Sequence, residues 1–190
     1  CIRDRGQKSQ VISHKSLKLM SLVLLFIIAS YSVLTYARNN VWKDDLTLWN
    51  DTVKKSPGKA RPYNNRGIDY YSRKEYQNAL SDYNKAIQIN PWYAEAYVNR
   101  GNVYNDIGLY DKAIDNFNQA LRIDPKFAIS YNNRGVAYHH KGKEEKAIYD
   151  YSQAIKIDPD YAKAYYNRGN IYNAAGEYDR AIADFSQALR

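Results

Sequence analysis

The chain has 190 residues, of which 45% are hydrophobic and 25% are charged, the mixture of an ordinary globular protein. Its net charge of +8 is unevenly placed: residues 1–59 carry 10 Lys and Arg against 4 Asp and Glu, and residues 60–190 carry 18 against 16. The nearly neutral larger part argues against a nucleic-acid partner. The single cysteine, Cys1, excludes an internal disulfide.

Residues 1–18 form a basic flank, and residues 19–37 follow as an uncharged apolar run. A run of this length matches the hydrocarbon core of a bilayer, so it predicts one transmembrane helix. A buried soluble helix and a cleaved signal peptide are the alternatives. Five basic residues precede the run and four follow it, which favours a cytoplasmic N-terminus and extracytoplasmic repeats, in a periplasm or lumen.

Residues 38–59 read as a half-repeat beside the membrane. Trp42, Leu46, Trp49, Val53 and Pro57 occupy the same register as the second helices of the repeats that follow. We therefore expect a single helix at residues 44–55 that caps the apolar edge of the first full repeat.

The remaining sequence repeats every 34 residues, as the spacing of Pro57, Pro91, Pro125 and Pro159 shows. The units are residues 60–93, 94–127, 128–161 and a truncated 162–190. Each is predicted to form two antiparallel helices, in the second unit Ala94–Ile107 and Tyr110–Ile123. Because the chain starts with Cys1 and stops where the next Asp-Pro is due, we expect both ends to be cuts in a longer protein.

Small residues recur at fixed places within the units. Glycine lies inside every first helix, at Gly67, Gly101, Gly135 and Gly169. Since a mid-helix glycine costs about 1 kcal/mol relative to alanine, four in one register imply a crowded contact with the second helix. Gly108, Gly142 and Gly176 lie at the junctions between helices, where a left-handed residue is expected, and Lys74 replaces glycine in the first unit.

The second unit carries Tyr97, Arg100-Gly101, Tyr104, Ala113, Phe117, Ala120 and Pro125, and this pattern resembles the tetratricopeptide repeat. The resemblance implies an all-α fold, a right-handed superhelix of stacked helix pairs. One departure recurs, because arginine stands where the family usually has leucine, at Arg66, Arg100, Arg134 and Arg168. Asp82, Asp150 and Asp184 are possible partners for these arginines, with Asn116 interrupting the series.

The apolar run and the half-repeat together resemble the junction found in membrane proteins related to the transmembrane and tetratricopeptide repeat-containing O-mannosyltransferases. This resemblance covers residues 19–66 and includes none of the family's active-site residues. It implies an alternative function, in which the repeats are the C-terminal region of a multi-spanning glycosyltransferase that uses a lipid-linked sugar.

In a stack of this kind the first helices line a concave groove. Their outward registers vary between units, for example Arg61, Glu95, Ile129 and Lys163, which suits recognition of an extended peptide. The most regular candidates form an asparagine row, and further asparagines flank it. The row is Asn65, Asn99, Asn133 and Asn167, and the flanking residues are Asn64, Asn132, Asn102, Asn170, Asn105 and Asn173.

An amide side chain offers a donor and an acceptor and can pair with a peptide unit. By resemblance to the repeats of O-GlcNAc transferase, the asparagine row would face the groove. The alternative is that each asparagine binds a neighbouring backbone group or helix end.

No residue pattern indicates catalysis, a cofactor or a metal site, since the adjacent His139 and His140 point in different directions on a helix. The sequence therefore predicts a non-enzymatic scaffold, anchored in a membrane through residues 19–37, that binds a protein or peptide in its groove.

Overall fold

A computed structural model describes residues 14–41 and 44–190 of the chain, and these residues form helices and short connections without any strand. Residues 1–13 of the basic flank, together with Trp42 and Lys43, lie outside the described residues. The helices are α1 (His14–Val41), α2 (Asp45–Lys55), α3 (Ala60–Ser72), α4 (Tyr76–Ile89), α5 (Ala94–Asp106), α6 (Tyr110–Ile123), α7 (Ala128–His140), α8 (Glu144–Ile157), α9 (Ala162–Ala174) and α10 (Tyr178–Ala188).

Helix α1 contains a stretch, Leu17–Tyr36, that is long and apolar enough to cross a membrane. The stretch has 20 residues and a mean hydropathy of 2.2, and none of it is buried. Three serine hydroxyls in it, those of Ser21, Ser30 and Ser32, each donate to a backbone carbonyl four residues earlier, at 2.8–2.9 Å. Their hydrogen bonds are therefore made within the helix itself.

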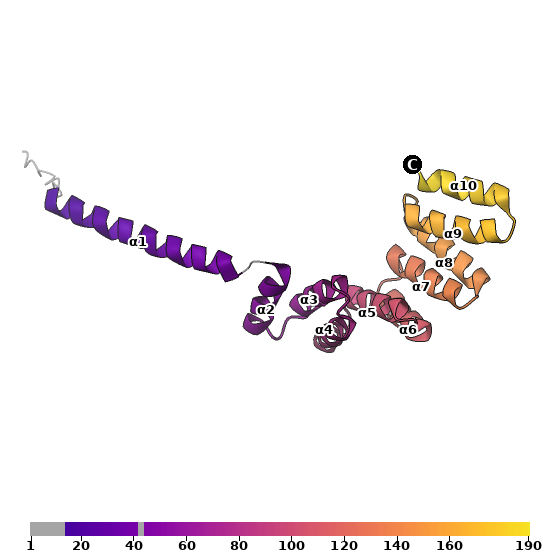
Figure 1. Cartoon of the computed structure of the whole chain (residues 1–190), viewed down its shortest axis with the longest axis horizontal. Coiled ribbons are helices and arrows are strands. Elements are labelled where there is room, and N and C mark those ends of the chain that lie inside the picture. The colour runs from indigo at the N-terminus through magenta and orange to yellow at the C-terminus, as the bar shows by residue number, and fades with distance from the viewer. Residues whose placement is uncertain (1–13, 42–43) are drawn as a thin grey trace, which may run out of the picture. The chain divides into compact units, whose positions relative to one another are not determined.

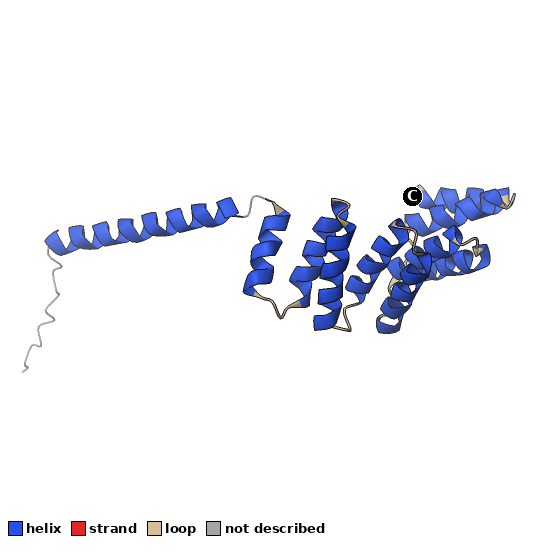
Figure 2. Ribbon diagram, turned by 60° about the horizontal axis from the view of Figure 1, so that its bottom comes forward, coloured by secondary structure: helices blue, strands red, loops and turns tan. Residues whose placement is uncertain are grey.

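The repeats form a compact unit of their own, whose boundary with the N-terminal unit falls between Leu48 and Trp49, inside α2. Figure 1 shows the pairs α3–α4, α5–α6, α7–α8 and α9–α10 following one another along the chain, and Figure 2 shows them as antiparallel hairpins. Each second helix also contacts the first helix of the next repeat. The stack of helix pairs predicted from the 34-residue period is confirmed.

The glycine inside each first helix lies against an aromatic ring of the second helix, as the sequence predicted. A Cβ atom added to Gly67, Gly101, Gly135 or Gly169 would come within 2.6–2.8 Å of the Cε1 atom of Tyr83, Phe117, Tyr151 or Phe185, respectively. Three of these rings are at most 1% exposed. The core of each repeat is thus a glycine–aromatic contact that leaves no space for a methyl group.

The recurring arginines join the second helices of neighbouring repeats. Three of them donate two hydrogen bonds of 2.7–2.8 Å to a carboxylate of their own repeat, in the pairs Arg66–Asp82, Arg134–Asp150 and Arg168–Asp184. Arg100 instead donates to the Oδ1 atom of Asn116. The expected series of aspartate partners with one interruption is confirmed.

The Nη1 nitrogen of each arginine donates a further hydrogen bond to the preceding second helix. Its acceptors are Asn50, Asn84, Asn118 and Ser152, in chain order, at 2.6–2.9 Å. Asn50 belongs to α2, so this helix supplies the acceptor for the first arginine of the series. The half-repeat cap at residues 38–59 stays a prediction.

The junctions between paired helices need a left-handed residue. Gly108, Gly142 and Gly176 have φ angles of 78°, 66° and 76°, and Lys74 has a φ of 61° at the equivalent place. An L-residue in this conformation is strained by roughly 1–2 kcal/mol, whereas glycine is not. Lys74 is therefore a local weak point in the first repeat.

Replacing Lys74 by glycine is expected to raise the free energy of unfolding by about 0.5–1 kcal/mol, since the relief of strain exceeds the added entropy of the unfolded chain. The measurement is urea unfolding of the full chain in detergent micelles, followed by circular dichroism. The reverse change, Gly142→Lys, should lower stability by about 1 kcal/mol. Equal stability of the Lys74→Gly variant and the parent would contradict the assignment of strain.

Candidate functional site

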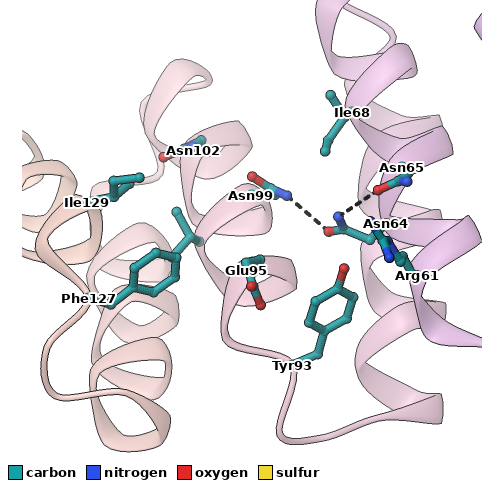
Figure 3. Close-up of a pocket in the computed structure, with 11 residues that line it drawn as sticks. Arg61, Asn64, Asn65, Ile68, Tyr93, Glu95, Asn99, Asn102, Phe127 and Ile129 are labelled. Carbon is teal, nitrogen blue, oxygen red and sulfur yellow. Dashed lines mark hydrogen bonds between the residues drawn. The ribbon is translucent and has the colours of Figure 1, made fainter.

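The first helices of successive repeats contact one another directly and form one wall of the array. A pocket of about 550 Å³ lies on this wall, between α3, α5 and α7 (Figure 3). Its lining residues come from these three helices and the turns before α5 and α7: Arg61, Asn64, Asn65, Ile68, Tyr93, Glu95, Val98, Asn99, Asn102, Phe127 and Ile129. We call this pocket the groove.

The groove combines apolar and polar chemistry. Ile68 and Ile129 are 43% and 44% exposed, and they leave aliphatic surface open to water in the groove. Val98 and Phe127 line the same pocket and pack against the core of the second repeat. Such a surface favours a ligand that brings an apolar side chain, because burying it removes aliphatic area from water.

Two opposite charges lie in the same pocket, Arg61 on α3 and Glu95 on α5. Neither forms an ion pair within residues 44–190. Both act on the phenol of Tyr93, whose pKa is raised above its ordinary value chiefly by burial and then by Glu95, with Arg61 opposing. At neutral pH Tyr93 therefore presents a neutral hydroxyl to the groove.

Within residues 44–190, the side chains of the asparagine row form hydrogen bonds to other amides and not to backbone groups. In the first two repeats, Asn99 Nδ2 donates to Asn64 Oδ1 at 3.0 Å, and Asn64 Nδ2 donates to Asn65 Oδ1 at a long 3.5 Å, as Figure 3 shows. Because Asn99 lies on α5 and Asn64 on α3, this chain of amides links two neighbouring first helices.

A second chain of amides links the later repeats. Asn167 Nδ2 donates to Asn132 Oδ1 at 3.0 Å, Asn132 Nδ2 to Asn133 Oδ1 at 3.0 Å, and Asn133 Nδ2 to Asn102 Oδ1 at 2.8 Å. Asn133 donates to Asn102 because Val98 stands at the position that Asn64 and Asn132 occupy in the first and third repeats, and the valine side chain offers no acceptor.

From the sequence, the asparagine row has two interpretations, a ligand contact and a bond to local backbone. The amide-to-amide bonds between first helices belong to neither, because the distance between helices could not be read from the sequence. They use both ends of the Asn64, Asn132 and Asn133 amides. The Nδ2 groups of Asn65 and Asn102 and the Oδ1 atoms of Asn99 and Asn167 make no side-chain bond among the described residues.

The other predicted asparagines divide by position. Asn64, Asn65, Asn99 and Asn102 line the groove, whereas Asn132, Asn133 and Asn167 continue the same rows on α7 and α9. Asn105 is half-buried and its Oδ1 atom lacks a hydrogen-bond partner in the described chain. The remaining two, Asn170 and Asn173, are exposed on α9.

Sequence reasoning missed two aromatic residues of the groove, Tyr93 and Phe127. They precede α5 and α7 by one residue and fall outside the helical registers that were compared. Their signal was present, since Tyr93, Phe127 and Tyr161 recur at 34-residue spacing. For metal binding, the described ranges contain no group of three or more His, Cys, Asp or Glu side chains that could hold an ion.

A sequence profile described as TPR repeat matches residues 67–108, 101–142 and 137–174, which together exceed half of the chain. This chain belongs to the tetratricopeptide repeat family. A second profile, tetratricopeptide repeat, matches residues 162–190. The matches begin at residue 67, so the resemblance of residues 19–66 to O-mannosyltransferase-related proteins stays a hypothesis.

Solved tetratricopeptide repeat structures share the fold. A crystal structure of MamA is 26% identical, with a TM-score of 0.67, over 76% of this chain and 84% of that chain. The thermophilic protein TTC0263 of Thermus thermophilus is 26% identical, with a TM-score of 0.62, over 68% of this chain and 73% of that chain.

The first repeat domain of Spaghetti (RPAP3), solved with the HSP90 peptide SRMEEVD, is 24% identical, with a TM-score of 0.60, over 62% of this chain and 94% of that chain. No curated protein matches the sequence.

Proposed function

We propose that the repeat array binds an extended segment of another polypeptide in the groove, that helix α1 holds the array at a membrane, and that the role is binding and not catalysis. The observation that carries the proposal is the groove itself, about 550 Å³ in volume and lined by three first helices with exposed aliphatic side chains and half-buried amides. Protein–protein interaction is the typical role of this family.

The unengaged amide groups favour a peptide as the ligand. Asn65 and Asn102 offer Nδ2 donors, and Asn99 offers an Oδ1 acceptor, all within one pocket. A peptide backbone presents one donor and one acceptor per residue, so it can use both kinds of group. The same fold holds a peptide in one of the solved structures.

Alanine replacement of Asn65, Asn99 and Asn102 together is expected to weaken peptide binding by about 100-fold, at roughly 1 kcal/mol for each lost hydrogen bond. The probe is a set of 12-residue peptides selected from a displayed random library with the full chain in detergent micelles. Binding of the labelled peptides is then measured by fluorescence anisotropy.

The matched control is Gln88→Ala with Gln119→Ala, two amides on the second helices, away from the groove, which should leave binding unchanged. A library that yields no binding peptide, or equal loss in both variants, would overturn the groove as the binding site. Circular dichroism checks that the triple variant keeps its helices, since Asn99 also joins α5 to α3.

The membrane part of the proposal rests on the uncharged length of residues 19–36 and on serine hydroxyls that are satisfied within the helix. A lipid-exposed helix must satisfy its polar groups internally, and α1 does so at these three serines. A signal sequence passes the same test of length and composition, so the membrane experiment measures chain mass as well.

We expect the full chain, expressed in bacteria, to stay in the membrane pellet after alkaline carbonate extraction, with its mass intact. Leu24→Arg combined with Ile28→Arg should release it, because each central arginine costs about 2.5–3.5 kcal/mol of insertion free energy. Leu109→Arg, at an exposed turn of the repeats, serves as the control. A chain shortened by cleavage within residues 19–40 would instead identify a signal sequence.

A further inference from the structure

The groove carries its two charges in a fixed order along the stack. Arg61, Glu95 and Ile129 occupy the same position in the first helices of repeats one, two and three, and all three line the pocket. Arg61 is a cation without an ion-pair partner, Glu95 is an anion without one, and Ile129 is a 44% exposed aliphatic side chain. These statements hold for the described residues 44–190.

Arg61 and Glu95 are both exposed at the pocket, so a ligand can bring an opposite charge to each, and complementary charges set the register of a bound chain. Both charges lie near Tyr93 in the same pocket (Figure 3), so one bound segment can contact both of them. The exposed isoleucine supplies the third contact by burial of apolar area.

The spacing of the three positions fixes the spacing in the ligand. Packed helices lie about 8–10 Å apart, and the first helices of successive repeats are in direct contact. An extended chain advances about 3.3 Å per residue, so it crosses from one first helix to the next in about three residues.

We infer that the groove selects an extended polypeptide segment that carries an acidic, a basic and an apolar side chain at intervals of about three residues. The acidic side chain faces Arg61, the basic one faces Glu95, and the apolar one covers Ile129. This inference rests on the proposed function, because it names the ligand of the same groove. The Nδ2 groups of Asn65 and Asn102 and the Oδ1 atom of Asn99, which make no side-chain bond among the described residues, hold the backbone between these contacts.

Exchanging the two charges of the groove tests the inferred order of acidic, basic and apolar side chains in the ligand. The full chain in detergent micelles is used to select 12-residue peptides from a displayed random library, and the selection is repeated with the double variant Arg61→Glu, Glu95→Arg. The parent should enrich peptides with an acidic and a basic residue about three apart and an apolar residue beyond the basic one. The double variant should enrich the reverse charge order, with the apolar residue then beyond the acidic one.

Binding of a single peptide from the parent selection gives the magnitude. We expect Glu95→Arg alone to weaken it at least tenfold, and the double variant to prefer the charge-exchanged peptide by at least tenfold. Glu145→Arg, an equal change of net charge at an exposed place on α8, should leave the affinity within twofold.

The outcomes separate the two claims. If no peptide binds the parent chain, the proposed function fails. If peptides bind in the groove but the two selections give the same charge pattern, or if Glu145→Arg weakens binding as much as Glu95→Arg, only the inferred ligand class is wrong.

Discussion

Replacing Asp150 by alanine is expected to lower the free energy of unfolding by about 3 kcal/mol, because removal of one partner of a buried ion pair leaves an uncompensated charge. Asp150 has a side-chain exposure of 1% and Arg134 one of 16%, and two hydrogen bonds of 2.7 and 2.8 Å join them. The measurement is urea unfolding of the full chain in detergent micelles, followed by circular dichroism.

The chain provides its own control at the equivalent place of the second repeat. Arg100 there binds the neutral amide of Asn116, and burial lowers the pKa of Arg100, whereas the hydrogen bonds to Asp82 and Asp184 raise the pKa of Arg66 and Arg168. Asn116→Ala should cost about 2 kcal/mol, because it removes one hydrogen bond from the charged guanidinium and the bond from Asn116 Nδ2 to the Lys112 carbonyl but breaks no ion pair. Equal losses in Asp150→Ala and Asn116→Ala would show that charge pairing adds nothing to the contact.

Asn116→Asp is the reciprocal change, and it would complete the series of carboxylates. We expect it to raise stability by about 1 kcal/mol, since a carboxylate accepts two charge-paired bonds from the guanidinium, as Asp150 does from Arg134, where the amide of Asn116 accepts one. A loss of stability would mean that the second repeat cannot hold a desolvated carboxylate beside Arg100.

The second large effect is expected from Gly101→Ala, a change that removes a helix-destabilising residue and still lowers stability. The new methyl group would lie 2.6 Å from the Cε1 atom of Phe117, whose side chain is fully buried. Overpacking of this kind costs about 1–3 kcal/mol, and at its upper end it outweighs a gain of about 1 kcal/mol in helix propensity. The expected net loss is about 2 kcal/mol, measured by the same unfolding experiment.

Two further variants show whether the ring is the cause. Gly58→Ala adds a methyl group where no heavy atom lies within 4 Å, so it should leave stability nearly unchanged. Adding Phe117→Leu to Gly101→Ala should cost less than the two single changes combined, because the smaller side chain leaves space for the methyl group. Strict additivity would contradict the steric explanation.

The repeat architecture could be predicted from the sequence because its signals are local and are repeated four times. The prolines set the period, and the glycines at 108, 142 and 176 mark the junctions where left-handed backbone is found. Helix α6 has the predicted bounds, and α5 ends one residue earlier than predicted. The glycine–aromatic contact was also predictable in kind, because a costly residue retained in four equivalent places requires a steric reason.

The hydrogen-bond partners of the asparagines could not be predicted, because they depend on the distances between packed helices. The bonded residues are 31–35 positions apart in sequence. The sequence shows that an amide recurs at residue 99 or 133, but only the packed first helices show which other amide lies within 3 Å of it. Asn133 donates to Asn102 because the residue equivalent to Asn64 in the preceding repeat is Val98, so this partner too is set by the neighbouring repeat. Predicting a hydrogen bond between side chains on two helices requires the relative placement of both helices, whereas a repeat period can be read from the sequence alone.

By itself, then, the sequence determined the family, the helix pairs and the residues that face the wall of first helices, because periodic patterns record which face of each helix is packed. The tertiary structure alone decided that Tyr93 and Phe127 join this wall and that the amides of the row bind flanking amides. It also decided that Arg61 and Glu95 share one pocket without pairing within the described residues. These outcomes depend on how successive repeats approach each other, and no periodic pattern within a single repeat records that approach.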